Sequence, residues 1–203
     1  MTYRKVCLSV LLLLVSSCAA YANADSQERA LAEIKSLGGQ FERDETVPGK
    51  PVVKIDLHGT KVSDLDLKFL KKFKELRTLD LRLTQIGDEG VANIKDLTKL
   101  RTLNLFRTQL TDRGLARLKK LTQLETLLIG GTNVTDAGLV NLKSMTRLKK
   151  LSLFKTQVSD AGIAHLKVLV NLETLLIAGS RISEAGAKEL QRALPRVRFD
   201  EMT

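Results

Sequence analysis

The chain has 203 residues, of which 43% are hydrophobic and only 4% are aromatic, with no tryptophan. This apolar content is ordinary for a globular protein, so it excludes an intrinsically disordered chain and predicts a core of aliphatic side chains. The formal net charge of +10 is compatible with an acidic partner, a nucleic acid or an anionic membrane surface.

Residues 1–24 predict a signal peptide. A short positive stretch at Arg4 and Lys5 precedes an apolar run over residues 6–15, which is shorter than the roughly 20 residues that a membrane-spanning helix needs. Small residues near the end of this segment predict cleavage after residue 22 or 24. Alternatively, Val15-Ser16-Ser17-Cys18 resembles a bacterial lipobox, which predicts cleavage after residue 17 and a lipid on Cys18. Both alternatives stay open.

All cysteine lies in this first segment, as Cys7 and Cys18. The processed chain therefore contains no pair for a disulfide, no cysteine-rich zinc site and no cysteine nucleophile within its folded part. We expect no metal and no cofactor.

Residues 25–51 predict an N-terminal cap made of a helix and a loop. Asp25 and Glu28 resemble a capping box, and Gly38 follows the last apolar residue of the helix. The apolar stripe comprises Leu31, Ile34 and Leu37. Proline and glycine then predict a loop over residues 44–51.

Residues 52–195 form six consecutive units with a period of 24 residues. Leu76-Arg-Thr-Leu79-Asp-Leu81 returns from Leu100, Leu124, Leu148 and Leu172, and a weaker copy starts at Val52. One unit has too few apolar positions, at roughly 2 kcal/mol each, to offset the ordering of 24 residues. The units must therefore stack and cover one another.

Each unit combines two periodicities. The leucine pattern alternates as in a short strand, whereas later apolar residues fall three apart, as at Leu115, Leu118 and Leu121, and predict a short helix. Between them lies Ser/Thr-Asp-x-Gly, whose hydroxyl or carboxylate is expected to cap the helix. Its glycine is expected to let neighbouring units approach closely.

This pattern resembles the leucine-rich repeat, with threonine or serine where asparagine is usual, and its Asp-x-Gly-Leu resembles the bacterial, ribonuclease-inhibitor-like subclass. The resemblance implies a right-handed α/β solenoid with short parallel strands on the concave face and short helices on the convex face. It also implies hydroxyls bonded to the backbone along each turn, at Thr60, Thr84, Thr108, Thr132, Thr156 and Ser180. Residues 196–203 are expected to form a C-terminal cap strand containing Val197 and Phe199.

The resemblance implies that residues between the strand leucines project from the concave face. Among those positions we predict a partner-binding set of Arg77, Arg82, Arg101, Phe106, Arg107, Lys149, Phe154 and Lys155. A second period of 48 residues relates Phe106 to Phe154, which are expected roughly 10 Å apart at about 4.8 Å per strand. Alternatively, both phenylalanines only cover neighbouring strand residues.

Other functions find less support. Lys71, Lys95, Lys119, Lys143 and Lys167 recur at one helix position, which is typical of a solvated face. The two histidines, His58 and His165, occupy different registers, and no catalytic or nucleic-acid-binding motif is present. We therefore expect a non-catalytic module, secreted, periplasmic or in the cell envelope, that binds a protein with a mild preference for acidic surfaces. The alternative is a structural or lipid-anchored envelope component. The sequence leaves the oligomeric state open, and it predicts membrane contact only through a lipid on Cys18.

Overall fold

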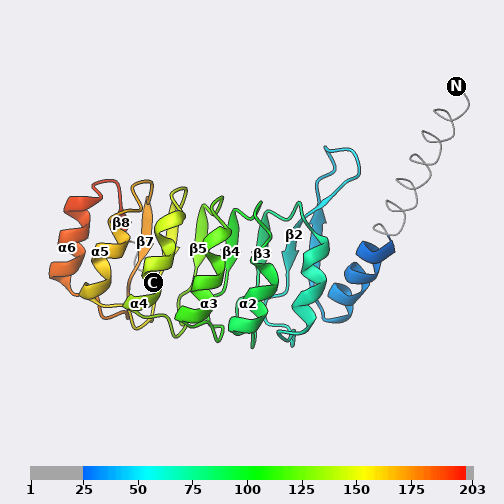
Figure 1. Ribbon diagram of the computed structural model, residues 1–203, viewed down its shortest axis with the longest axis horizontal. Coiled ribbons are helices and arrows are strands. Elements are labelled where there is room, and N and C mark those ends of the chain that lie inside the picture. The colour runs from blue at the N-terminus through cyan, green and yellow to red at the C-terminus, as the bar shows by residue number, and fades with distance from the viewer. Residues whose placement is uncertain (1–24, 200–203) are drawn as a thin grey trace, which may run out of the picture.

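The computed structural model describes residues 25–199, which form an elongated stack with one layer of strands and one layer of short helices (Figure 1). The segment predicted to be a signal peptide, with Cys18, lies outside the described residues, as do residues 200–203.

Within the described residues, eight strands form one open sheet in chain order. They are β1 (Gln40–Arg43), β2 (Val52–Asp56), β3 (Thr78–Asp80), β4 (Thr102–Asn104), β5 (Thr126–Leu128), β6 (Lys150–Ser152), β7 (Thr174–Leu176) and β8 (Arg198–Phe199). Strand β1 is antiparallel to β2, and each later pair is parallel. Leu79 pairs with Leu103 and Leu103 with Leu127, so the register advances by one 24-residue unit at each step.

A short helix follows each strand from β2 to β7. These helices are η1 (Asp66–Lys72), α2 (Asp88–Ile94), α3 (Asp112–Arg117) with η2 (Leu118–Lys120), α4 (Asp136–Leu139) with η3 (Val140–Ser144), η4 (Asp160–Gly162) with α5 (Ile163–Leu166), and α6 (Glu184–Ala193). They lie beside one another along one side of the sheet (Figure 1). The 3₁₀ turns suit the apolar spacing of three, because residues i and i+3 share one side of a 3₁₀ helix.

One continuous aliphatic core runs through the stack between the two layers. The equivalent leucines Leu79, Leu103, Leu127, Leu151 and Leu175 are fully buried, each between its counterparts in the neighbouring units. The predicted α/β solenoid with an open parallel sheet is confirmed.

A threonine hydroxyl closes the turn after each strand from β2 to β6, whereas Ser180 Oγ, after β7, accepts from the Ile182 amide. Thr108 Oγ1 donates to the Leu105 carbonyl at 2.8 Å, and Thr132 Oγ1 donates to the Ile129 carbonyl at 2.6 Å. Both threonines are at most 6% exposed. A buried hydroxyl without a partner would destabilise the fold, and this bond satisfies it within its own unit.

Of the two groups in the Ser/Thr-Asp-x-Gly motif that were expected to cap the helix, the hydroxyl does so and the aspartate does not. Thr135 Oγ1 accepts from the Ala137 amide and is the cap. Asp112 instead accepts from the Thr135 amide at 2.8 Å and from the Thr135 hydroxyl at 2.6 Å, one unit further along. We call this repeated contact, made by Asp88, Asp112, Asp136 and Asp160, the aspartate ladder.

The glycine of the motif makes room for the aspartate ladder. A Cβ atom on Gly138 would overlap the Asp112 carboxylate, and one on Gly114 would overlap that of Asp88. Neighbouring units therefore approach closely at this glycine, as expected, because the carboxylate of one unit lies against the glycine of the next.

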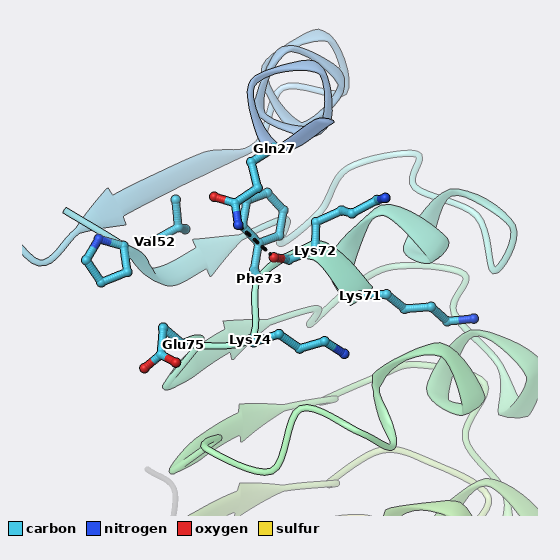
Figure 2. A pocket seen from close by; sticks show the side chains of 8 residues that line it. Gln27, Val52, Lys71, Lys72, Phe73, Lys74 and Glu75 are labelled. Carbon is cyan, nitrogen blue, oxygen red and sulfur yellow. Dashed lines mark hydrogen bonds between the residues drawn. The ribbon is translucent and has the colours of Figure 1, made fainter. Parts of the chain in front are cut away.

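Both ends of the stack are covered. Residues 25–36 are helical, with Leu31 and Ile34 buried in the core, and Gly38 follows with a φ of +82°. Gln27 Nε2 donates to the Lys72 carbonyl at 3.0 Å and ties this helix to the first unit (Figure 2). At the other end, β8 pairs with β7 after α6.

Candidate binding face

The side chains of each strand alternate between the core and the open side of the sheet. In β3, Leu79 is buried while Thr78 and Asp80 on either side of it are half-buried. We call this open side the sheet face. It is formed by the residues that flank the central leucine or isoleucine of each strand. It also includes two residues further along, which follow the leucine or isoleucine that comes directly after the strand.

A groove of about 630 Å³ runs over the sheet face. It is lined from all six units, by His58, Arg82, Leu83, Asn104, Phe106, Leu128, Lys150, Ser152 and Leu176. Its two halves differ in chemistry.

In the N-terminal half, polar groups satisfy one another. Asp80 accepts from the Arg82 amide at 3.0 Å and from Asn104 Nδ2 at 3.2 Å. Asp56 accepts from the amide and the ring of His58 at 3.0 and 2.7 Å. Partial burial raises the pKa of Asp56, but the bonds from His58 outweigh it and place that pKa below its ordinary value of 3.8.

Toward the C-terminal half, Phe106 of the groove forms an aromatic pair with Phe154, which lies outside the groove lining. Their ring centroids are 6.2 Å apart with planes tilted by 34°, so the expected separation of roughly 10 Å is wrong for the rings. The intervening unit carries Gly130, where a Cβ atom would lie 3.1 Å from that of Phe154. Because this position has no side chain, the two rings come together across it.

A basic side chain covers each ring. The Arg107 guanidinium lies 5.3 Å from the Phe106 centroid, and Lys155 Nζ lies 5.1 Å from the Phe154 centroid. These are cation–π contacts. The structure thus brings four of the predicted binding residues together on one part of the sheet face.

Arg107 and Lys155 have left-handed backbone, with φ of +53° and +50°. Leu83 at the same position of its unit has φ of +59°, and the other three units carry Gly59, Gly131 and Gly179 there. A non-glycine residue in this conformation costs about 1–2 kcal/mol. Strain of this kind is often found at functional sites.

Of the other predicted residues, Arg77, Arg101 and Lys149 lie at the border of this surface, whereas Arg82 is part of it. Arg77 pairs with Asp44 at 3.1 Å. Arg101 and Lys149 both face Glu125, at 3.9 and 3.0 Å. The hydrogen bond from Lys149 lowers the pKa of Glu125. Arg82 lines the groove 3.5 Å from Asp80.

The predicted set included Arg82 and Phe106 but not the other seven groove residues, which are His58, Leu83, Asn104, Leu128, Lys150, Ser152 and Leu176. Leu128, Ser152 and Leu176 are neighbours in the register, and they occupy the position between the two strand leucines that is expected to project from the concave face. Ser152 is 3% exposed, and its Oγ has no hydrogen-bond partner among residues 25–199. Leu83, which also lines the groove, was outside the expected positions altogether.

A second cavity, of about 310 Å³, lies between the N-terminal helix and the first units. Figure 2 shows Lys71, Lys72 and Lys74 at this cavity, extending toward the same side. Within the described part of the chain, no group of three His, Cys, Asp or Glu residues could hold a metal ion. None of the helices described there has the length and apolar character to cross a membrane.

Comparison with known proteins supports the assignment of the fold. Residues 75–95 and 96–119 match the model of the Leucine Rich repeat family. No curated protein matches the sequence significantly.

Two solved structures of Listeria monocytogenes proteins are similar. An internalin (inlF) has a TM-score of 0.56 at 20% identity over 84% of this chain, and an internalin C2 has a TM-score of 0.52 at 20% identity over 85%. The alignment covers 54% of the first protein and 92% of the second, so this chain spans about half the length of the first. With the match of residues 75–119 to the family model and the repeated 24-residue register, these findings show that the chain has a leucine-rich-repeat fold.

Proposed function

We propose that this protein is a non-catalytic recognition module that binds another protein through its sheet face. The observation that carries the proposal is the group of Phe106, Arg107, Phe154 and Lys155, in which a half-buried aromatic pair is flanked by two exposed cations. Aromatic residues and arginine are enriched among the residues that dominate binding energy in protein interfaces.

The charge distribution supports a partner with an acidic surface. The sheet face and its border carry Arg82, Arg101, Arg107, Lys149 and Lys155, and only some of these have a carboxylate nearby. An electrostatic contribution of this kind weakens as salt screens exposed charges. The signal-peptide pattern of residues 1–24 supports a location outside the cytoplasm, in the envelope or beyond it.

The test is a capture experiment with the processed protein against envelope and surface fractions. Replacing Phe106, Arg107, Phe154 and Lys155 together by alanine is expected to weaken capture at least tenfold. The midpoint of thermal unfolding should change little. Capture by the unmodified protein should also fall at high salt.

The control carries Lys95→Ala, Lys119→Ala and Lys143→Ala on the helix side, which also removes exposed cations. This control should capture the partner as well as the unmodified protein does. Equal loss in both variants would mean that net charge, and not the sheet face, governs binding. A quadruple variant that melts at a much lower temperature would identify the four residues as structural.

A further inference from the structure

The groove on the sheet face is long enough to define the length of a ligand. It reaches from His58 in the first unit to Leu176 in the sixth, which is five strand spacings or about 24 Å. An extended chain advances about 3.3 Å per residue, so about seven residues span the groove.

Among residues 25–199, the two halves of this groove differ in how far their polar groups are already hydrogen-bonded. In the N-terminal half, Asp56, Asp80 and Asn104 already accept hydrogen bonds from neighbouring groups. In the C-terminal half, Phe106 and Leu128 offer apolar surface, and Leu176, 5% exposed, lines the groove beside them. An apolar side chain placed there would remove this surface from water.

Three cations around the apolar half have no carboxylate within salt-bridge distance among residues 25–199. They are Arg107, Lys150 and Lys155, whereas Arg77 and Lys149 at the border each have one. Lys150 lines the groove itself. The charge that complements this half of the groove is therefore negative.

Ser152 adds an unused hydrogen-bonding group. It lies between Leu128 and Leu176 in the register, lines the groove, and has no partner for its Oγ in the described part of the chain. The equivalent positions of neighbouring units carry leucine, so the fold itself does not require a hydroxyl here.

We propose that the groove binds an extended segment of another protein, about seven residues long, in which leucine or phenylalanine adjoins aspartate or glutamate. The apolar side chain lies against Phe106, Leu128 and Leu176. The carboxylates pair with Lys150, Arg107 and Lys155, and a backbone carbonyl accepts from Ser152. This inference rests on the proposed function and specifies its ligand.

The experiment selects binders from a random heptapeptide library displayed on phage, using the immobilised processed protein. The expected binders are enriched in Asp or Glu next to Leu or Phe. A synthetic peptide of the selected sequence should bind at least tenfold more weakly to the variant Arg107→Glu, Lys150→Glu, Lys155→Glu. It should bind with unchanged affinity to Lys95→Glu, Lys119→Glu, Lys143→Glu, which has the same net charge.

Ser152→Ala separates a ligand-binding hydroxyl from a structural one. The variant is expected to bind the selected peptide about fivefold more weakly, as for loss of one hydrogen bond, without a fall in thermal midpoint. A lower midpoint with unchanged affinity would overturn the role of Ser152.

The outcomes distinguish this inference from the proposed function. Basic or purely apolar binders that require Phe106 and Phe154 would overturn the ligand class and leave recognition by the sheet face intact. Binders indifferent to every sheet-face substitution would overturn both. A concentration-dependent dimer that Phe106→Ala and Phe154→Ala abolish, without peptide binders, would assign the groove to a second copy and overturn the inference.

Discussion

At the scale of single residues, the sheet face depends on pairs of large and small side chains in successive units. Arg107 lies over Gly131, where an added Cβ atom would be 2.8 Å from Arg107 Cγ. Lys155 lies over Gly179 in the same way, at 2.7 Å. These glycines therefore have two roles, a left-handed backbone and space for a neighbour's side chain.

Substitution of Gly131 separates those two roles. Gly131→Ala is expected to lower the free energy of unfolding by about 2–4 kcal/mol, because it adds a steric conflict with Arg107 to the cost of a left-handed alanine. Gly59→Ala is the control, because Gly59 has a φ of +65° and nothing within 4 Å of its Cβ position. It should cost only about 1–2 kcal/mol. Equal losses in urea unfolding would show that the Arg107 contact contributes nothing.

The sequence predicted which residues form the aromatic pair but not how their rings are arranged. The 48-residue period identified Phe106 and Phe154 as equivalent, and strand spacing predicted a separation of roughly 10 Å. The ring separation depends on side-chain torsions and on the empty position at Gly130, neither of which a repeat pattern specifies. The left-handed conformation of Leu83 was equally hidden, because leucine does not indicate it as Gly59 does.

At the scale of elements, the aspartate ladder joins each helix to the next. Asp160 accepts from the Ser183 amide at 2.8 Å and from its hydroxyl at 2.6 Å, so it connects η4 to the start of α6. The hydroxyl bond, followed by the amide bond, lowers the pKa of Asp160 below its ordinary 3.8. The motif residues were evident in the sequence, but the direction of these bonds was not, because each of them crosses to the next unit.

The lowered pKa of Asp160 predicts a pH-dependent contribution from Ser183. A carboxyl whose pKa is lower in the folded chain stabilises the fold fully above its unfolded pKa, and this contribution is lost as pH falls through the folded pKa. Ser183→Ala should therefore destabilise the protein more at about pH 6 than at about pH 3, as measured by urea unfolding.

The control for that measurement is Ser36→Ala. Ser36 Oγ donates to the Glu33 carbonyl, and no carboxylate titrates with this bond. Its effect on unfolding should be the same at both pH values. If Ser183→Ala also lowered the free energy of unfolding equally at both pH values, the proposed role of the Asp160 contact would be contradicted.

At the scale of the whole molecule, stability comes from units that cover one another. The fold class was predictable because the same leucine positions recur with a fixed period, and stacking places equivalent leucines in one row. The groove was only partly predictable, since its lining comes from all six units and its volume depends on side-chain packing. That the Ser152 hydroxyl has no hydrogen-bond partner among residues 25–199 follows from the positions of all its neighbours, which the sequence does not give.

The position of a leucine in the stack should determine how much it contributes to the free energy of unfolding. Leu127→Ala, in the central strand β5, is expected to lower the free energy of unfolding by about 3–5 kcal/mol, because units on both sides hold the cavity open. Leu194→Ala, near the C-terminal end and 4% exposed, should cost about 2–3 kcal/mol. Chemical denaturation of both variants gives the comparison. A larger loss for Leu194→Ala would contradict stabilisation by neighbours on both sides.

The alternation of bulky and small residues along the sheet face has a consequence for how this protein can change its length. Phe106-Arg107 is followed by Gly130-Gly131, and Phe154-Lys155 by Ala178-Gly179. This alternation covers the third to the sixth unit, because Arg82-Leu83 of the second unit stands beside Phe106-Arg107 of the third. Within those four units, inserting or deleting a single unit would place two bulky pairs, or two small pairs, side by side. Duplication there preserves the alternation only in steps of 48 residues.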